Sequence, residues 1–383
     1  MGNGWMGKVI RVNLTEGTVK TEPLNMEDAR LYAGGRGLGA KYCADLIAPN
    51  ADPLGPKNVL AFMAGPLTGT LAPCAGMVAV ASKVPQSGEL GSCVSGGYFG
   101  PELKFAGFDG IIVEGKAKNP VYLFLSNDRI ELRNAGHLWG RTVPETVKEI
   151  VKEAGCDGKI ACIGPSGERL DLSAVIENDG HRTAESLGFG AVMGSKNLKA
   201  IAVKGTGSIR TAKKQEFLNA CLKARKAMKE SSASCVGQPS DIPDGWLTYL
   251  AGNWKRPCFV KDGFGTRHPA GTGKCFGCFP ICGTAVEIER PQFTGFDKIL
   301  KKEMDWSFEP GSAEAEPAEQ KQFRSFLAFV CSAGICPFAT TAVGLHDLAG
   351  MYGTCTGFDI TEEEILQIGE RIRNLEMLFN RDI

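Results

Sequence analysis

The sequence has no excess of charge of either sign and no long apolar run. It carries 43 basic and 43 acidic residues, a balance that argues against nucleic-acid or membrane-surface binding, because both use a basic patch. No apolar stretch reaches the roughly 20 residues that cross a bilayer. The N-terminus shows no basic and then apolar signal region. We therefore expect a cytoplasmic protein with neither a nucleic acid nor a membrane as partner.

Histidine is also scarce. The four histidines, His137, His181, His268 and His346, show no paired spacing, so a role at the surface or in the core is expected for each. The 49 glycines form clusters without a period, which excludes collagen and simple repeats. Such clusters predict tight turns and close approach of the backbone to a ligand.

Cysteine is plentiful by contrast, with 14 residues. A disulfide framework would need a secreted chain, so metal or redox roles are expected for some thiols and plain burial for others. Three of them form the C-x2-C-x3-C run Cys275-Phe-Gly-Cys278-Phe-Pro-Ile-Cys282. Thiolates so close together can converge on one soft metal centre.

A centre of this kind needs a fourth ligand, and the best candidate is Cys336. It precedes Pro337, and a cluster with three local ligands usually takes its last from a distant cysteine followed by proline or a turn. An iron–sulfur cluster of the cubane type is favoured. Structural zinc and buried thiols without metal are the alternatives, although zinc sites usually show a second C-x2-C or histidine pair.

The pattern up to about residue 205 is that of an α+β domain. Strands show alternating or continuous apolar residues, and helices show caps and helical spacing. We expect a hairpin (8–14 with 18–21), a short helix (26–32), strands (59–65, 77–84, 110–114, 121–125, 129–133, 159–163 and 172–176) and a helix that begins at the capping box Thr142–Glu145.

Glycine clusters interrupt these elements. Residues 34–39 superficially resemble a dinucleotide loop, but they lack the G-x-G-x-x-G spacing and a buried strand in front. Residues 95–107 predict a glycine loop that enters a short helix, whose N–H groups suit an anion, with a tight helix–strand junction as the alternative. Residues 178–201 predict a flexible basic loop that holds phosphate through Arg182 and Lys196, the alternative being solvated surface charges.

From Thr211 onward the pattern becomes helical. A helix over 213–229 places Phe217, Cys221, Ala224 and Met228 on one stripe, a second is expected over 320–335, and the capping box Thr361–Glu364 opens a last one. The expected organisation is an α+β domain (1–208), a helix and Cys-run segment (209–308), an acidic linker (309–320) and a helical C-terminal segment with the fourth cluster cysteine (321–383).

The glycine loops and cysteines together resemble one family, the aldehyde:ferredoxin oxidoreductases, which are tungsten enzymes with a bis-pterin cofactor. The resemblance rests on the Cys run and on residues 64–70, 96–107, 178–182, 190–201, 333–336 and 368–371. It implies an N-terminal domain of two β-sheets with short helices that clasps the pterins. A reduced, mostly helical C-terminal region would follow.

The resemblance also implies cofactors and chemistry. A [4Fe–4S] cluster would lie on Cys275, Cys278, Cys282 and Cys336, and the tungsten (or molybdenum) bis-pterin would be held by Gly96, Gly97, Arg182, Thr183 and Gly190. An aldehyde would be oxidised to a carboxylic acid, with electrons leaving through the cluster to ferredoxin or another small electron carrier. A homodimer is compatible with this expectation, and no catalytic residue is assigned.

The sequence also departs from the family. Members are considerably longer, the region between about residues 295 and 322 is contracted, and the Asp-x-x-Gly-Leu-Asp motif and the Glu and His near the metal are not found. Met77 stands where the family has an Arg, Cys331 where it has an Asp, and residues 185–187 replace Gly-Arg-Gly. The alternative is therefore a shortened, non-catalytic or electron-transfer paralogue that keeps the cluster without a complete pterin pocket.

Overall fold

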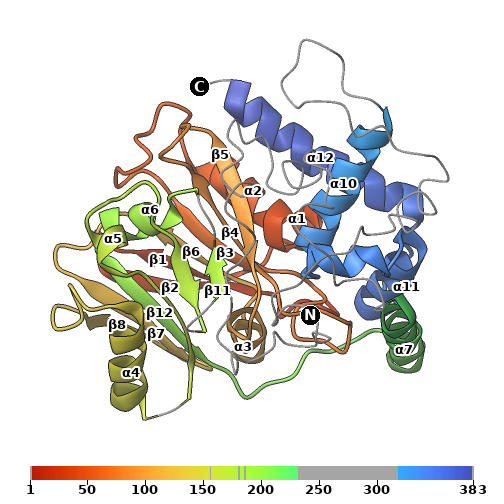
Figure 1. The fold of residues 1–383 in the computed structure, drawn as a ribbon, viewed down its shortest axis with the longest axis horizontal. Helices are drawn as coiled ribbons and strands as arrows, with labels where there is room; N and C mark the ends of the chain where they lie inside the picture. Colours follow the sequence, from red (N-terminus) through yellow and green to blue (C-terminus); the bar gives the residue numbers. More distant parts are fainter. Residues whose placement is uncertain (1, 156, 180–181, 185–186, 232–317, 382–383) are drawn as a thin grey trace.

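The computed structural model describes residues 2–155, 157–179, 182–184, 187–231 and 318–381. These residues form two mixed six-stranded sheets followed by helices (Figure 1), which confirms the α+β class. Sheet A contains β1 (Lys8–Asn13), β2 (Thr18–Pro23), β3 (Leu60–Ala64), β4 (Val78–Lys83), β5 (Leu90–Ser95) and β6 (Gly110–Glu114). Sheet B contains β7 (Val121–Ser126), β8 (Arg129–Asn134), β9 (Lys159–Cys162), β10 (Ile176–Asn178), β11 (Arg182–Ala184) and β12 (Leu198–Lys204).

Short helices connect the strands of the N-terminal part and longer helices follow it. The first group is α1 (Met26–Tyr32), α2 (Gly35–Leu46), α3 (Phe99–Phe105), α4 (Val143–Ala154), α5 (Pro165–Glu168) and α6 (Phe189–Ser195). The second is α7 (Lys214–Ser231), α10 (Ala318–Ala333), the 3-10 helix η3 (Pro337–Thr341), α11 (Leu345–Thr356) and α12 (Glu362–Arg381). Among the described residues, no helix is long and apolar enough to span a membrane.

The strands β3 and β4 of sheet A are buried on both faces. All residues of β3 are buried, and their side chains alternate between two cores, as the period of a strand requires. Leu60 and Phe62 lie in the core between the two sheets, whereas Ala61 and Met63 lie in the core beneath α2 and the C-terminal helices. Figure 1 shows the C-terminal helices α10, α11 and α12, coloured blue, on one side of the molecule and sheet B with α4 on the other.

The two sheets repeat one topology. Their strand orders are β2-β1-β6-β3-β4-β5 and β8-β7-β12-β9-β10-β11, with a parallel pair, β1–β6 or β7–β12, at the same place in each. A Gly-Pro pair follows both β3 and β9. Seven-residue helices that begin with Phe-Gly, α3 and α6, precede β6 and β12. The spacing of these features differs between the halves, so the glycine clusters show no period in the sequence.

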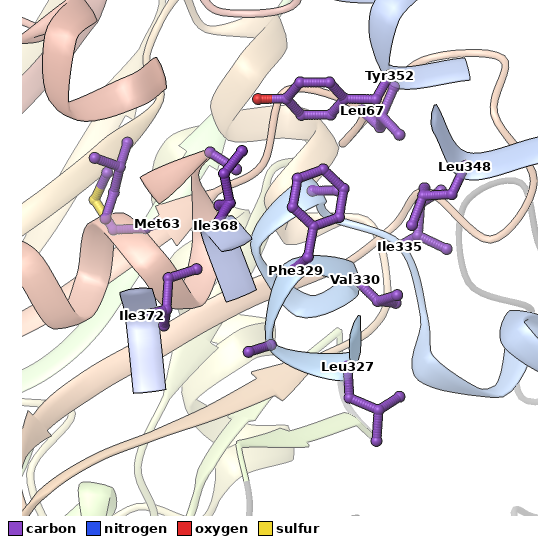
Figure 2. Close-up of a cluster of buried hydrophobic side chains, with 14 of the residues drawn as sticks. Met63, Leu67, Leu327, Phe329, Val330, Ile335, Leu348, Tyr352, Ile368 and Ile372 are labelled. Atoms are coloured by element: carbon purple, nitrogen blue, oxygen red, sulfur yellow. The ribbon is translucent and has the colours of Figure 1, made fainter. Parts of the chain in front are cut away.

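The C-terminal helices share one apolar core with sheet A. Figure 2 shows Phe329 and Val330 of α10 between Ile368 and Ile372 of α12 and Leu348 of α11. The stripe predicted for α7 is confirmed, because Phe217, Cys221, Ala224 and Met228 are all buried. The proposed domain boundaries stay a prediction.

The contact between α10 and α12 is unusually close at Gly369. A Cβ atom at this position would lie 1.8 Å from the carbonyl oxygen of Ser325. Only a residue without a side chain fits there, so the two helix backbones pack directly against each other.

A buried ion pair fixes the start of the chain. Lys104 and Asp109 are both fully buried, with Nζ and Oδ1 2.6 Å apart. Asp109 also accepts hydrogen bonds from the N–H groups of Met6 and Gly7, at 3.0 and 2.7 Å, and Lys104 donates to the carbonyl of Gly4 at 2.6 Å. Hydrogen bonds that satisfy both charges offset the cost of their burial.

Several sequence predictions are wrong in detail. The strand expected over 172–176 is absent from the described residues, since β10 begins only at Ile176 and Asp171 and Ser173 form a turn before it. The flexible loop expected over 178–201 contains β10, β11, α6 and β12 in its described residues. The helix expected over 320–335 begins earlier, at Ala318, inside the expected linker. The elements β5, α2 and α11 were not predicted.

Candidate cofactor site

The predicted site residues fall in two described regions. Cys336 lies after α10. Of the predicted pterin contacts, Gly96, Gly97, Arg182 and Thr183 lie where β5 of sheet A meets β11 of sheet B, and Gly190 lies in α6. Cys275, Cys278 and Cys282 lie outside the described residues. The cluster ligand set therefore stays a prediction.

Backbone contacts hold Cys336 against the loop 65–77. Its N–H donates to the carbonyl of Cys74 at 3.0 Å, and the N–H of Leu67 donates to the carbonyl of Ala333 at 3.0 Å. Between them, Gly334 adopts φ 91°, and a Cβ there would lie 2.1 Å from Thr68 Oγ1. A left-handed glycine is thus needed to turn the chain out of α10 and place Cys336, which is half-buried.

The cluster Gly34–Gly39 forms the start of α2 and receives the end of α10. A Cβ at Gly35 would lie 2.4 Å from the carbonyl oxygen of Cys331, and the N–H of Gly37 donates to Ser332 Oγ at 2.9 Å. These glycines therefore allow one helix to approach another. This packing role could not be predicted from the sequence, because the partner residue lies almost 300 residues away.

The glycine loop after β5 is joined to the end of β10. Ser95 Oγ donates to Asn178 Oδ1, and Asn178 Nδ2 donates to the carbonyl of Gly96 at 2.7 Å. The N–H groups of Tyr98 and Phe99 donate to Asp179 Oδ2 at 2.5 and 3.3 Å. The anion at the start of α3 is therefore a carboxylate of the chain itself, and the loop is also a tight junction between the two sheets.

The second carboxylate oxygen of Asp179, Oδ1, differs from Oδ2 in its hydrogen bonding. Oδ1 is buried and accepts no hydrogen bond from any residue that the structure describes. A buried acceptor without a donor is costly, and it suits a ligand with N–H groups. Asp179 itself adopts φ 56°, an uncommon conformation for a residue with a side chain. Sequence reasoning missed Asp179, although it stands beside a glycine inside a block that carries the family resemblance.

Arg182 and Thr183 lie on β11, across the hairpin from Asn178 and Glu177. Both are partly exposed, and a guanidinium at this place can pair with phosphate. Gly190 is buried in α6, its N–H donates to the carbonyl of Ala174 at 3.0 Å, and a Cβ would lie 2.6 Å from the carbonyl oxygen of Val175. The observed role of Gly190 is close packing, and its contact with a pterin stays a prediction.

Lys196 is neither a solvated charge nor placed to hold phosphate, contrary to both alternatives considered from the sequence. It is fully buried, and its ammonium group donates to the carbonyls of Asn58 and Gly115. Burial lowers its pKa to about 8, because desolvation disfavours the charged form. Lys196 therefore joins the loops at one end of the sheets.

Met77 lies between the region around Cys336 and α3. It is buried, its carbonyl accepts a hydrogen bond from Thr68 Oγ1 at 2.9 Å, and a Cβ at Gly100 would lie 3.0 Å from the same oxygen. Thr68 belongs to the loop that receives the end of α10, and Gly100 belongs to α3. The carbonyl of Met77, the residue that the resemblance aligns with an arginine of the family, thus lies between the Cys336 region and α3.

The described residues contain no group of three or more His, Cys, Asp or Glu side chains that could hold a metal ion. A cavity of about 420 Å³ lies between α1 and α12, where Tyr32 and Arg371 contribute to its wall. It is apart from the predicted site residues. His137 and His346 are exposed and pair with Glu153 and Glu362.

Comparisons with known proteins agree with this arrangement. Residues 9–205 match the family model "Aldehyde ferredoxin oxidoreductase, N-terminal domain", and residues 294–382 match "Aldehyde ferredoxin oxidoreductase, domains 2 & 3". The tungsten-containing aldehyde ferredoxin oxidoreductase of Pyrococcus furiosus is 51% identical over 219 residues, which are 57% of this chain and 36% of that protein. The enzyme of the same description from Thermococcus kodakarensis is 50% identical, with the same shares covered.

The names of two further relatives mention other compounds. The WOR-like subunit of an aliphatic sulfonate oxidoreductase of Pyrococcus furiosus is 38% identical over 57% of this chain and 37% of that protein. A solved structure, the active site complex BamBC of benzoyl coenzyme A reductase with 1,5-dienoyl-CoA, has a TM-score of 0.63 at 26% identity, covering 93% of this chain and 64% of that one. The matched part of this chain spans little more than a third of the length of the curated relatives. The family model that covers residues 9–205 nevertheless accounts for half of the sequence, and the chain belongs to the aldehyde ferredoxin oxidoreductase family.

Proposed function

We propose that this chain is an iron–sulfur, tungsten-pterin oxidoreductase that oxidises an aldehyde to a carboxylic acid and passes the electrons through a [4Fe–4S] cluster to ferredoxin or another small carrier. Water supplies the oxygen atom, and two electrons and two protons leave for each aldehyde. The observation that carries the proposal is the repeated topology of sheets A and B, whose β5 and β11 ends meet. Two sheets of the same topology that meet at one place suit a cofactor with two pterins, one for each sheet.

The described residues fit such a cofactor in three respects. Gly96 and Gly97 allow close approach of the backbone, Arg182 offers a guanidinium for phosphate, and the buried Oδ1 of Asp179 is an acceptor without a donor among the described residues. When bound, the tungsten bis-pterin supplies the two-electron chemistry and the cluster accepts electrons one at a time.

The chain would hold these groups close together. Cys336 and α3 are linked through the buried segment that contains Cys74 and Met77. The core between the sheets is apolar, with Phe62, Phe99 and Phe189 fully buried, so it keeps water away from the rear of the site. We also infer a cytoplasmic location from the family and from the reduced thiols that the cluster needs.

Aldehyde is proposed as the substrate because the relatives with about 50% identity carry it in their names. The alternative is a shortened, non-catalytic or electron-transfer paralogue that keeps the cluster. It is supported by Met77, which stands where the resemblance places an arginine of the family. Loss of groups around a metal site typically costs about 10–100-fold in affinity or activity.

Metal analysis of the protein purified without oxygen separates the two functions. The enzyme is expected to contain about four iron atoms per chain together with stoichiometric tungsten or molybdenum, and to reduce ferredoxin when an aldehyde is added. Iron at this level without tungsten or molybdenum would refute the enzymatic function and favour the electron-transfer paralogue. Stoichiometric tungsten would refute the paralogue with an incomplete pocket.

A further inference from the structure

Asp179 connects the two sheets at the edge where the predicted pterin contacts gather. Its Oδ2 accepts the N–H groups of Tyr98 and Phe99, at 2.5 and 3.3 Å, from the end of the loop that follows β5. Its own N–H donates to the carbonyl of Ile160 at 3.2 Å, at the strand β9 of sheet B. One residue therefore binds the glycine loop of sheet A while it is anchored in sheet B.

Neighbouring contacts reinforce the connection. Asn178 binds Ser95 and the carbonyl of Gly96 through its side chain, and the ammonium group of Lys159 on β9 lies 5.3 Å from the centre of the Tyr98 ring. Asn178 is also paired with Arg182 in the hairpin of β10 and β11. The loop with Gly96 and Gly97 and the strand with Arg182 and Thr183 are thus held by the same two residues.

Gly97 packs directly against the carboxylate of Asp179, which leaves no room for a side chain. It adopts φ 118°, and a Cβ at this position would lie 2.1 Å from Asp179 Oδ2 and 3.0 Å from Asn178 Nδ2. A side chain at residue 97 would have to displace the carboxylate. The glycine is therefore required by Asp179 as well as by its backbone conformation.

We propose that Asp179 is a positioning residue that holds the Gly96–Gly97 loop and the Arg182–Thr183 strand in one fixed arrangement, so that both halves of the cofactor site are formed before a pterin binds. This inference rests on the proposed function. An ionised carboxylate suits the role because charge-assisted hydrogen bonds to backbone N–H groups are short and strong. Residues that orient cofactor contacts in this way need not touch the reacting atoms.

The test compares Asp179→Ala and Asp179→Asn with Asp171→Asn as a matched control. Asp171 is exposed and accepts the N–H of Ser173 at 3.0 Å within its own turn, so its replacement by Asn removes the charge from the same kind of bond away from the site. Pterin is measured by fluorescence after acid oxidation, before and after extended dialysis, together with tungsten and iron per chain.

Asp179→Ala is expected to lose pterin and tungsten on dialysis about tenfold faster than the wild type, with unchanged iron. Asp179→Asn should be intermediate, since its amide oxygen can accept the same N–H groups without the charge. Asp171→Asn should match the wild type. Retention of pterin by Asp179→Ala at the wild-type rate would overturn the inference.

A double-mutant cycle tests the contact without any cofactor. Gly97→Ala and Asp179→Ala should each lower Tm, and the double variant should lower it by clearly less than the sum, because removal of the carboxylate leaves room for the new methyl group. Additive shifts would refute the proposed fit between the two residues. A wild-type protein without pterin would refute the proposed function, while the cycle would still decide whether Asp179 fixes the loop.

Discussion

Replacement of Gly369 by alanine should destabilise the C-terminal helices and the position of Cys336. Gly369 lies in α12, and its Cβ would fall 1.8 Å from the carbonyl oxygen of Ser325 in α10. Non-bonded heavy atoms do not approach closer than about 3–3.5 Å, so the helices would have to separate by roughly 1.5 Å. Such overpacking costs typically about 1–3 kcal/mol and occasionally more.

Alanine would also favour the helix by up to about 1 kcal/mol relative to glycine. The steric cost acts against two backbones, which cannot rotate away as a side chain can, and we expect it to prevail. With the steric cost at the upper end of its range, the net loss should be about 2 kcal/mol of unfolding free energy. Gly350 is the matched control, since it lies exposed in α11 with nothing within 4 Å of its Cβ position. Gly350→Ala should stabilise the protein by about 0.4–1 kcal/mol.

Urea denaturation followed by far-UV circular dichroism measures both variants against the wild type. The visible absorbance of the protein purified without oxygen reports the cluster in parallel, because α10 leads directly to Cys336. A Gly369→Ala variant as stable as Gly350→Ala would refute the reasoning. It would mean that α10 and α12 do not pack with their backbones in contact.

Two further predictions concern single side chains. Cys336→Ser should bleach or convert the absorbance spectrum of the cluster. The control Cys93→Ser, on β5, should leave the spectrum unchanged. An unchanged spectrum in Cys336→Ser would remove Cys336 from the ligand set. For Lys196, the pKa is lowered from 10.5 to about 8 in the folded protein, so between these values the unfolded chain binds more protons and the unfolding free energy rises with pH. The urea midpoint of the wild type should therefore increase between about pH 8 and pH 10, and that of Lys196→Met should increase less. The same pH dependence of the midpoint in both proteins would contradict a buried, weakly basic Lys196.

Elements with strong local patterns were predictable from the sequence. The capping box at Thr142 forms as expected, with Glu145 accepting the N–H of Thr142 at 2.9 Å, and the box at Thr361 opens α12. The helix Met26–Tyr32 has the predicted bounds. In each case the determining contacts lie within one or two turns of the chain.

Elements that depend on distant partners were missed. The helix α2 begins with three glycines in five residues, a composition that disfavours a helix by itself, and it is stabilised by contacts with α10 and α12 that sequence separation conceals. The described residues of the loop expected over 178–201 form strands and a helix for the same reason. Lys196 is buried there because carbonyls from two other loops satisfy its ammonium group.

The sequence by itself determined the α+β class, the family and the candidate cofactor residues, because alternating strands, caps and motif blocks are local features of the chain. Only the tertiary structure decided that the two sheets repeat one topology, that the glycines at 34–37 receive α10, and that Asp179 binds the loop at Gly97. These features arise where segments about 80 to 300 residues apart meet. Such meetings are set by the packing of whole layers, which no local pattern records.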